Sequence, residues 1–242
     1  MVRPSHPGRD AEHGPGRLPA VVGAATSRPR AVRPGTLRLL WIRHGEVEPR
    51  YQRVFGGRLD IGLSERGREQ ARALAAALEA TPLAAVWVSP QRRARLTAEP
   101  LLALNGHHPV VEPDLREIDF GDWTGLGWEE VRDRFGVSPY AWLDQVAAGG
   151  MPGGEPLAAL ESRVARVIER VRAAHREGVV ALVCHGGIIR LALARLLGVP
   201  LPLTAALEVD YGSVSIVDCR ERRAILRLLN HTPWHDPLAS AT

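Results

Sequence analysis

The stretch Leu37-Arg38-Leu39-Leu40-Trp41-Ile42-Arg43-His44-Gly45 indicates both the fold and the place of the functional site. Its apolar run over 37–42 predicts a strand. The tripeptide Arg43-His44-Gly45 follows at once, so a guanidinium and an imidazole stand where an α/β sheet presents groups to a ligand. A three-residue match is weak by itself, because such a tripeptide also arises by chance.

Three further segments strengthen this interpretation, because each carries a polar or charged side chain near a predicted strand. They are Ser89-Pro90-Gln91-Arg92-Arg93-Ala94, Leu115-Arg116-Glu117-Ile118-Asp119-Phe120-Gly121 and Cys184-His185-Gly186-Gly187. With the first stretch they place two histidines, two arginines and a carboxylate on strand-end loops. Phosphoryl transfer through a histidine would need such a set of groups.

Strands and helices alternate along most of the chain. Helices are predicted over 64–80, about 92–104, 157–174 and 186–197, and strands over 84–88, 110–111, 179–184, 213–219 and 223–229. Ser64 is the predicted N-cap of the first helix. The strand over 179–184 is nearly all apolar, which indicates a central strand buried on both faces. We therefore expect an α/β fold, a three-layer α/β/α sandwich with a mainly parallel central sheet. The Gly- and Trp-rich region between 111 and 157 is expected to be irregular.

Composition excludes several classes of function. The net charge of +4 equals the surplus of six arginines over two acidic residues within residues 1–36, so the rest of the chain is neutral and nucleic acid is not an expected partner. The chain has no lysine, which excludes P-loop and Schiff-base lysines. It has no apolar stretch of the roughly 18 to 20 residues that a membrane span needs, and no secretory segment, so we expect a cytoplasmic protein.

The 242 residues fit one domain between two tails. We expect a disordered Pro-, Gly- and Arg-rich tail over 1–36, a catalytic domain over 37–232 and a flexible C-terminal tail over 233–242. A transit peptide is a weaker interpretation of the first segment, because its prolines oppose an amphipathic helix. Cys184 and Cys219 are expected to be buried thiols. No metal-ligand spacing is present, and neither a metal nor a cofactor is expected.

The expected chemistry begins at His44, whose neutral imidazole could attack phosphorus. Arg43 and Arg93 would hold phosphate oxygens with their planar forks, and His185 would donate to the same phosphate from the start of a helix. The leaving alkoxide needs a proton from a carboxylic acid. Glu117 is the first choice for that acid. The alternatives, which also lie in this segment, are Asp119 and Asp122.

These segments resemble the histidine phosphatase superfamily, in its phosphoglycerate-mutase-like branch. The motifs of that family are similar to Arg43-His44-Gly45-Glu46, 89–94, 115–125, Pro152-Gly153-Gly154-Glu155 and 185–187. The resemblance runs from Leu37 to about Leu229. It implies that His44 is phosphorylated, that Arg43, Arg93 and His185 hold the phosphate, and that Glu117 is the proton donor.

Departures from the family pattern bear on the substrate. Val47 and Arg50 replace a Ser or Thr and an Asn, and Arg50 could contact phosphate or point to solvent. The segment 117–136 lacks the stretch by which mutases hold a phosphoglycerate, so a metal-independent phosphomonoesterase acting on a small phosphorylated metabolite is favoured over a cofactor-dependent phosphoglycerate mutase.

The run over 54–64 is similar to that of α-ribazole phosphatases, which suggests α-ribazole 5′-phosphate as a substrate. A non-catalytic phospholigand-binding protein is a third hypothesis. The sequence does not determine the oligomeric state.

Overall fold

The computed structural model describes residues 32–221 and 223–234. The chain divides into two compact units, 1–31 and 32–242, and the first unit lies outside the described residues. Most of the two tails predicted over 1–36 and 233–242 therefore also lies outside the described residues. Within the described part, Thr36 is only 1% exposed and Val32 packs against the core, so packing begins before Leu37.

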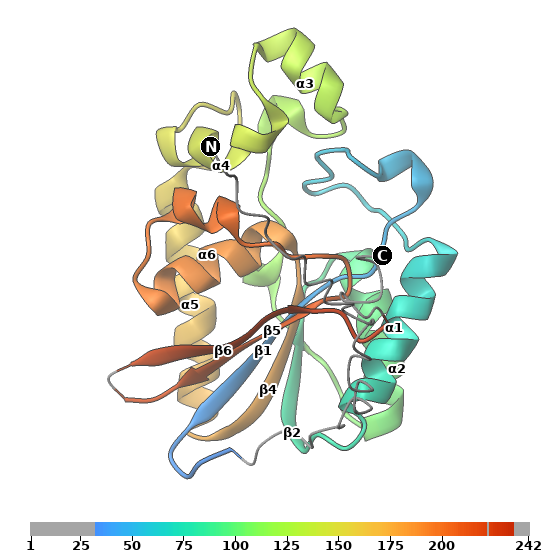
Figure 1. Ribbon diagram of the computed structural model, residues 1–242, viewed down its shortest axis with the longest axis vertical. Coiled ribbons are helices and arrows are strands. Elements are labelled where there is room, and N and C mark those ends of the chain that lie inside the picture. Colours follow the sequence, from blue (N-terminus) through green and yellow to red (C-terminus); the bar gives the residue numbers. More distant parts are fainter. Residues whose placement is uncertain (1–31, 222, 235–242) are drawn as a thin grey trace, which may run out of the picture. The chain divides into compact units, whose positions relative to one another are not determined.

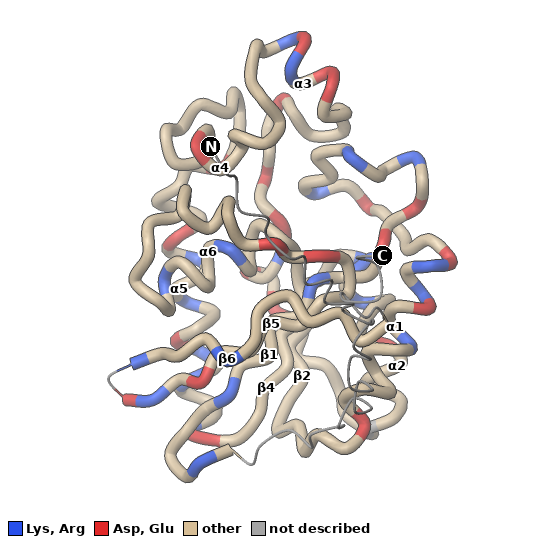
Figure 2. Tube along the Cα trace, viewed as in Figure 1, with Lys and Arg blue, Asp and Glu red and all other residues tan. Residues whose placement is uncertain are grey.

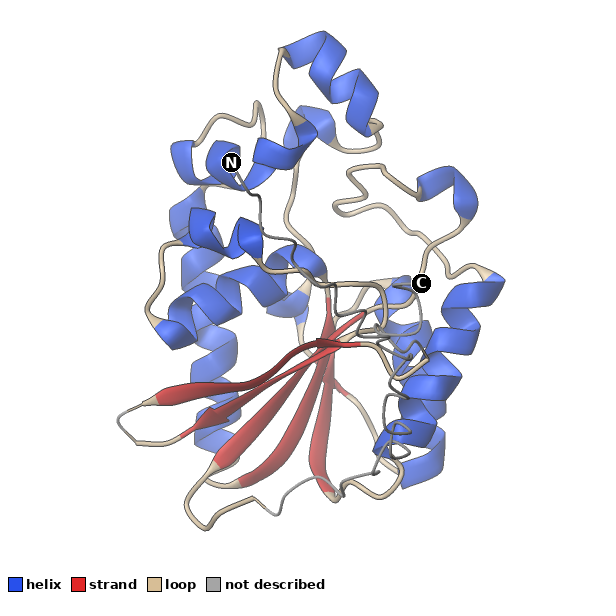
Figure 3. Cartoon of the chain, in the orientation of Figure 1, coloured by secondary structure: helices blue, strands red, loops and turns tan. Residues whose placement is uncertain are grey.

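The second unit is built on one six-stranded sheet in the order β3-β2-β4-β1-β5-β6 (Figures 1 and 3). The strands are β1 (Leu37–Arg43), β2 (Leu83–Val88), β3 (Val110–Val111), β4 (Gly178–Cys184), β5 (Val214–Cys219) and β6 (Ala224–His231). Strands β1 to β4 are parallel, β5 is antiparallel to β1, and β6 is antiparallel to β5. The predicted mainly parallel sheet is confirmed, and the apolar β4 lies between β2 and β1 in its interior.

Helices cover both faces of the sheet, as the three-layer prediction requires. The α-helices of the described chain are α1 (Glu65–Leu78), α2 (Arg92–Asn105), α3 (Trp128–Phe135), α4 (Trp142–Ala148), α5 (Leu157–Ala174) and α6 (Gly186–Leu197). Helices α1 and α2 lie on one face, and α5 and α6 lie on the other (Figure 1). Because successive strand residues point to opposite faces, Leu39 and Trp41 enter the core beneath α5 and α6, whereas Leu40 and Ile42 enter the core beneath α1 and α2. This explains why residues 39–42 are all apolar.

The start of α1 confirms a local prediction. The Ser64 hydroxyl accepts a hydrogen bond from the backbone N–H of Gly67 at 2.9 Å, so Ser64 is the N-cap. It also donates to a carboxylate oxygen of Glu46 at 2.7 Å. The cap therefore ties α1 to the loop that follows β1, which is the loop that carries His44.

The Gly- and Trp-rich region between β3 and α5 contradicts the expectation of irregular structure. It contains α3 and α4, of 8 and 7 residues, each ended by a left-handed glycine, Gly136 or Gly149, at φ 67°. Each buries only one or two residues, Val131 in α3 and Leu143 and Val146 in α4. Two turns are too short to establish a helical period, so the sequence pattern did not indicate them.

The structure also shows how charged residues are distributed and how apolar the helices are. Figure 2 shows arginines and acidic residues interspersed along the described chain, which agrees with the neutral balance beyond the first 36 residues. Within 32–221 and 223–234, none of the helices combines the length and apolar character that a membrane crossing needs.

Candidate active site

The register of the two central strands brings the two predicted histidines together. Arg43 lies opposite Cys184 in the parallel β1–β4 pair, so the next residue of each chain segment leaves the sheet at the same level. The backbone N–H of His44 donates to the carbonyl of Cys184 at 3.0 Å. The rings of His44 and His185 lie 5.2 Å apart between centroids. Adjacent parallel strands thus unite two motifs that are far apart in sequence.

His44 is held as a neutral ring with a free Nε2. Its side chain is buried, and Nδ1 lies 2.8 Å from the carbonyl oxygen of Gly45. A carbonyl can only accept, so Nδ1 carries the proton and Nε2 keeps its lone pair. Burial lowers the pKa of His44 well below its usual 6.5, and the charges of Arg93 and Arg43 lower it further. The imidazole is therefore available as a nucleophile at neutral pH.

Arg93 is a buried guanidinium in the first turn of α2, only 2% exposed. Its Nη2 donates to the Gly57 carbonyl at 2.8 Å and its Nη1 to the Leu59 carbonyl at 3.0 Å. Burial lowers the pKa of Arg93 to about 10, so the group is still charged at neutral pH. These two bonds use part of its five N–H donors and leave others for an anion.

Arg43 supplies the second guanidinium. Its Nη1 donates to the Val209 carbonyl at 2.6 Å, and its guanidinium carbon lies 4.0 Å from the centre of the Tyr211 ring. The Tyr211 ring also lies beside the His44 ring, tilted by 47° with centroids 5.5 Å apart. Among the described residues the buried Nε of Arg43 has no hydrogen-bond partner. Arg43 is thus fixed by a carbonyl and a ring while a donor stays unused.

His185 lies behind His44 rather than on the cavity wall. It is fully buried, and its Nε2 is 2.8 Å from the hydroxyl of Ser89. Burial lowers the pKa of His185 well below its usual value, as do the charges of Arg93 and Arg163. Its Nδ1 is buried without a hydrogen-bond partner in the described part of the chain. Its direct contact with phosphate stays a prediction.

Glu117 lies in the loop after the short helix over 113–115, and its carboxylate contacts the start of α6 and faces the same cavity as His44. Its Oε1 accepts from the N–H of Ile118 at 3.0 Å and its Oε2 from the N–H of Gly187 at 3.4 Å. A Cβ on Gly187 would lie 2.6 Å from Oε1, so only glycine leaves room for the carboxylate there. The competing acids lie elsewhere, because Asp119 pairs with Arg58 at 3.3 Å and neither Asp119 nor Asp122 lines the cavity.

Of the two positions expected for Arg50, contact with phosphate or exposure to solvent, the structure shows the second. Its side chain is 72% exposed and pairs with Glu48 at 3.2 Å. Its guanidinium also lies over the ring of Tyr51, 4.6 Å from the centroid. It does not line the cavity. The structure therefore does not bring Arg50 to the other predicted phosphate ligands.

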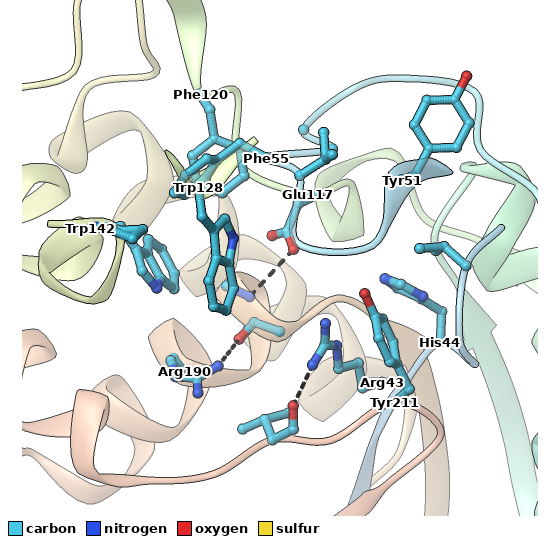
Figure 4. A pocket seen from close by; sticks show the side chains of 18 of the residues that line it. Arg43, His44, Tyr51, Phe55, Glu117, Phe120, Trp128, Trp142, Arg190 and Tyr211 are labelled. Atoms are coloured by element: carbon cyan, nitrogen blue, oxygen red, sulfur yellow. Dashed lines mark hydrogen bonds between the residues drawn. The ribbon is translucent and has the colours of Figure 1, made fainter. Parts of the chain in front are cut away.

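The cavity has a volume of about 370 Å³ and two different ends. Arg43, His44, Arg93 and Glu117 line the polar end. The other end is aromatic and is lined by Phe55, Phe120, Trp128, Tyr140 and Trp142. Figure 4 shows Trp128 and Trp142 on the side of the cavity away from His44. Four of the aromatic residues between β3 and α5 thus form a wall of the cavity, whereas Trp123 is fully buried in the core.

Sequence reasoning missed several residues that hold the site in shape. They are Gln91, Thr97, Arg163, Arg190 and Tyr211. Gln91 belongs to the segment Ser89–Ala94, in which only Arg93 was predicted to be functional. The other four residues stand in helices or loops where no sequence motif indicates a functional role. Each contacts a site residue or site loop from a distant part of the chain, which a local pattern does not reveal.

The sequence also led to expectations about the two cysteines and about metal binding. Cys184 and Cys219 are both buried free thiols, as predicted. Burial raises the pKa of the Cys184 thiol, so it is not a reactive thiolate. Within the described ranges, no group of three or more His, Cys, Asp or Glu side chains is arranged to hold a metal ion.

The lowered pKa of His44 has a measurable consequence. We expect its ring to stay neutral at pH 6, where an ordinary histidine of pKa about 6.5 is mostly protonated. The unfolded chain binds a proton at this residue below pH 6.5 while the native chain does not, so the free energy of unfolding falls as pH decreases below that value. Ring ¹⁵N chemical shifts measured across a pH titration test the first point, and thermal melting tests the second. A titration midpoint of His44 near 6.5 in the folded protein would contradict the assignment.

Known proteins resemble this chain over most of its length. The model of the histidine phosphatase superfamily (branch 1) matches residues 39–232. Phosphoserine phosphatase 1 of Hydrogenobacter thermophilus is 33% identical over 196 residues, which cover 81% of this chain and 93% of that protein. The adenosylcobalamin/α-ribazole phosphatase of Escherichia coli is 30% identical over 194 residues, 80% of this chain and 96% of that protein. A mycobacterial glucosyl-3-phosphoglycerate phosphatase, solved with inorganic phosphate, superposes with a TM-score of 0.70 at 29% identity and covers 82% of this chain and 99% of its own.

Proposed function

Because this chain belongs to branch 1 of the histidine phosphatase superfamily, we propose that it hydrolyses small phosphate monoesters through a phosphohistidine formed at His44. One observation carries the proposal. A neutral imidazole with a free Nε2 faces the same cavity as two guanidinium groups and a carboxylate. A nucleophile, charge compensation and a proton donor are the three requirements of phosphoryl transfer to a histidine.

In the first half of the reaction, Nε2 of His44 attacks phosphorus as the bond from phosphorus to the ester oxygen breaks. Arg43 and Arg93 balance the charge on the phosphoryl oxygens, and guanidinium forks suit this task. The departing oxygen takes a proton from the carboxylic acid of Glu117. The products are the free alcohol and a phosphohistidine, with Glu117 left as a carboxylate.

In the second half, water attacks the phosphohistidine and the bond from phosphorus to Nε2 breaks. Glu117 now accepts a proton from that water, which restores the acid for the next cycle. Inorganic phosphate leaves, and His44 returns to its neutral form. The Gly45 carbonyl, which accepts from Nδ1, keeps the ring orientation through both steps.

The aromatic end of the cavity favours an ester with a flat, apolar leaving group. Trp128 and Trp142 are both partly exposed on the cavity wall, which leaves their surfaces for contact with a ligand. A volume of about 370 Å³ suits a drug-sized ligand, since pockets of this kind span roughly 300 to 1,000 Å³. The proposed substrate is therefore α-ribazole 5′-phosphate, which carries a planar base, as the name of one relative suggests. The second candidate substrate is phosphoserine, which appears in the name of another relative.

A Trp128→Ala variant tests the leaving-group preference. We expect kcat/KM for α-ribazole 5′-phosphate to fall about tenfold, because stacking of a base on an aromatic side chain contributes roughly 1 to 3 kcal/mol. The value for phosphoserine is expected to change less than twofold, since a serine has no ring to stack, and it serves as the internal control. Equal losses on the two esters would show that Trp128 only supports the fold.

Purified protein assayed for phosphate release from both esters tests the proposed function itself. Adding 3-phosphoglycerate with catalytic 2,3-bisphosphoglycerate detects mutase activity as 2-phosphoglycerate. Phosphate binding without turnover of any ester would favour the non-catalytic hypothesis instead. We also propose that the protein acts in the cytoplasm, which cell fractionation tests.

A further inference from the structure

The main chain of Glu117 is held on both sides by side chains that do not line the cavity. On one side, the backbone N–H of Glu117 donates to Oε1 of Gln91 at 2.6 Å. On the other, the carbonyl of Glu117 accepts from Nη2 of Arg163 at 3.3 Å. Gln91 precedes α2 and Arg163 lies within α5, so the two contacts come from opposite faces of the sheet.

Arg163 is a buried arginine with all five donors engaged. Its side chain is 1% exposed, and Nε and Nη2 donate to the carboxylate of Glu155 at 2.7 and 2.9 Å. Nη1 donates to the carbonyls of Asp114 and Arg116, both at 2.8 Å. With the bond to Glu117, three carbonyls of one short segment converge on a single guanidinium, which makes the segment 114–117 rigid.

Gln91 joins three parts of the site. Its Nε2 donates to the Gly57 carbonyl at 2.8 Å, the same oxygen that accepts from Nη2 of Arg93. Its Oε1 accepts from Glu117, as described. The loop that contacts Arg93 and the loop that carries the acid are thus linked through one amide side chain. A change at Gln91 would shift the acid relative to the guanidinium.

We propose that Gln91 and Arg163 are positioning residues that place the carboxyl group of Glu117 within reach of the leaving oxygen. The proposal rests on the proposed function, in which Glu117 is the proton donor. Small displacements suffice for an effect, because a shift of about 1 Å at a reacting group can cost about 10²-fold in rate. Neither residue touches the cavity, so the expected loss concerns proton transfer and not the binding of phosphate.

Two esters with different leaving groups separate proton transfer from general damage. Ethyl phosphate releases an alkoxide that needs a proton, whereas 2,4-dinitrophenyl phosphate releases a stable anion that does not. The value of kcat/KM reports the steps up to formation of the phosphohistidine. The test variants are Gln91→Leu and Arg163→Lys, since lysine keeps the charge beside Glu155 but lacks the fork. Arg166→Lys on the same helix is the matched control, because among the described residues Arg166 bonds the side chain of Asp114 and does not reach the backbone of Glu117.

For both test variants we expect kcat/KM to fall about 10 to 10²-fold with ethyl phosphate and to stay within about threefold with 2,4-dinitrophenyl phosphate. Arg166→Lys is expected to match wild type on both esters. Equal losses on the two esters would overturn the proposal, because misfolding or a weakened phosphate site reduces both alike. If Arg163→Lys does not fold, Gln91→Leu decides.

A Glu117→Gln variant in the same series separates the two possible failures. A selective loss with Glu117→Gln, without one in the test variants, means that the acid is correctly identified and that its backbone contacts do not position it. An equal loss on both esters with Glu117→Gln means that the acid role itself is wrong.

Discussion

A His44→Ala variant is expected to lose phosphatase activity by on the order of 10⁴ to 10⁶-fold, the scale on which removal of a catalytic nucleophile acts. No other described histidine can replace it. His185 is fully buried with Nε2 next to the hydroxyl of Ser89, and it does not line the cavity. Among the described residues, His44 is the only histidine that lines the cavity with both guanidinium groups, and alanine removes its imidazole. The measurement is kcat/KM with a generic aryl phosphate.

Covalent trapping tests the same prediction directly. Brief reaction with a ³²P-labelled ester and quenching in base is expected to leave label on His44, in an acid-labile bond typical of phosphorus on nitrogen. His108→Ala is the control, because His108 is exposed and does not line the cavity. Wild-type turnover by His44→Ala, with an unchanged melting temperature, would contradict the nucleophile assignment.

A Glu117→Gln variant is expected to reduce kcat/KM for ethyl phosphate about 10² to 10⁴-fold, the usual contribution of a general acid. Glutamine keeps the size of the side chain and removes the transferable proton. Glu117 is also assigned the base role in the second half-reaction, so loss of that role is expected to slow hydrolysis of the phosphohistidine. Loss of both the acid and the base role predicts a burst of product release followed by slow turnover when the ester has a good leaving group.

With 2,4-dinitrophenyl phosphate, Glu117→Gln is expected to release one equivalent of dinitrophenolate in a fast burst and then turn over slowly. The phosphoenzyme accumulates because its formation needs no proton donor and its hydrolysis needs a base. Stopped-flow absorbance measures the burst. Asp119→Asn is the comparison. The sequence offered Asp119 as an alternative proton donor, and in the structure it pairs with Arg58. A larger loss in Asp119→Asn would reverse the assignment.

Much of the fold could be predicted because its signals are local. The apolar runs of β1 and β4 and the stripe of α5 follow from side-chain periodicity, which neighbouring residues carry by themselves. The predicted cap at Ser64 is equally local, as its hydroxyl reaches an N–H three residues away. The α3 and α4 helices were missed because two turns of helix do not establish a period.

The sequence by itself determined the α/β class and the parallel strands, and it predicted the candidate reactive groups, since each depends on residue type and short spacing. The tertiary structure decided which groups meet. It placed His44 beside His185 through the pairing of β1 with β4, and it turned Arg50 toward solvent.

The tertiary structure also brought Gln91 and Arg163 to the backbone of Glu117, 26 and 46 residues away along the chain. The physical reason is that hydrogen bonding and burial depend on distances of a few ångströms between segments that lie far apart in the sequence. Only packing of the sheet and its helices sets those distances.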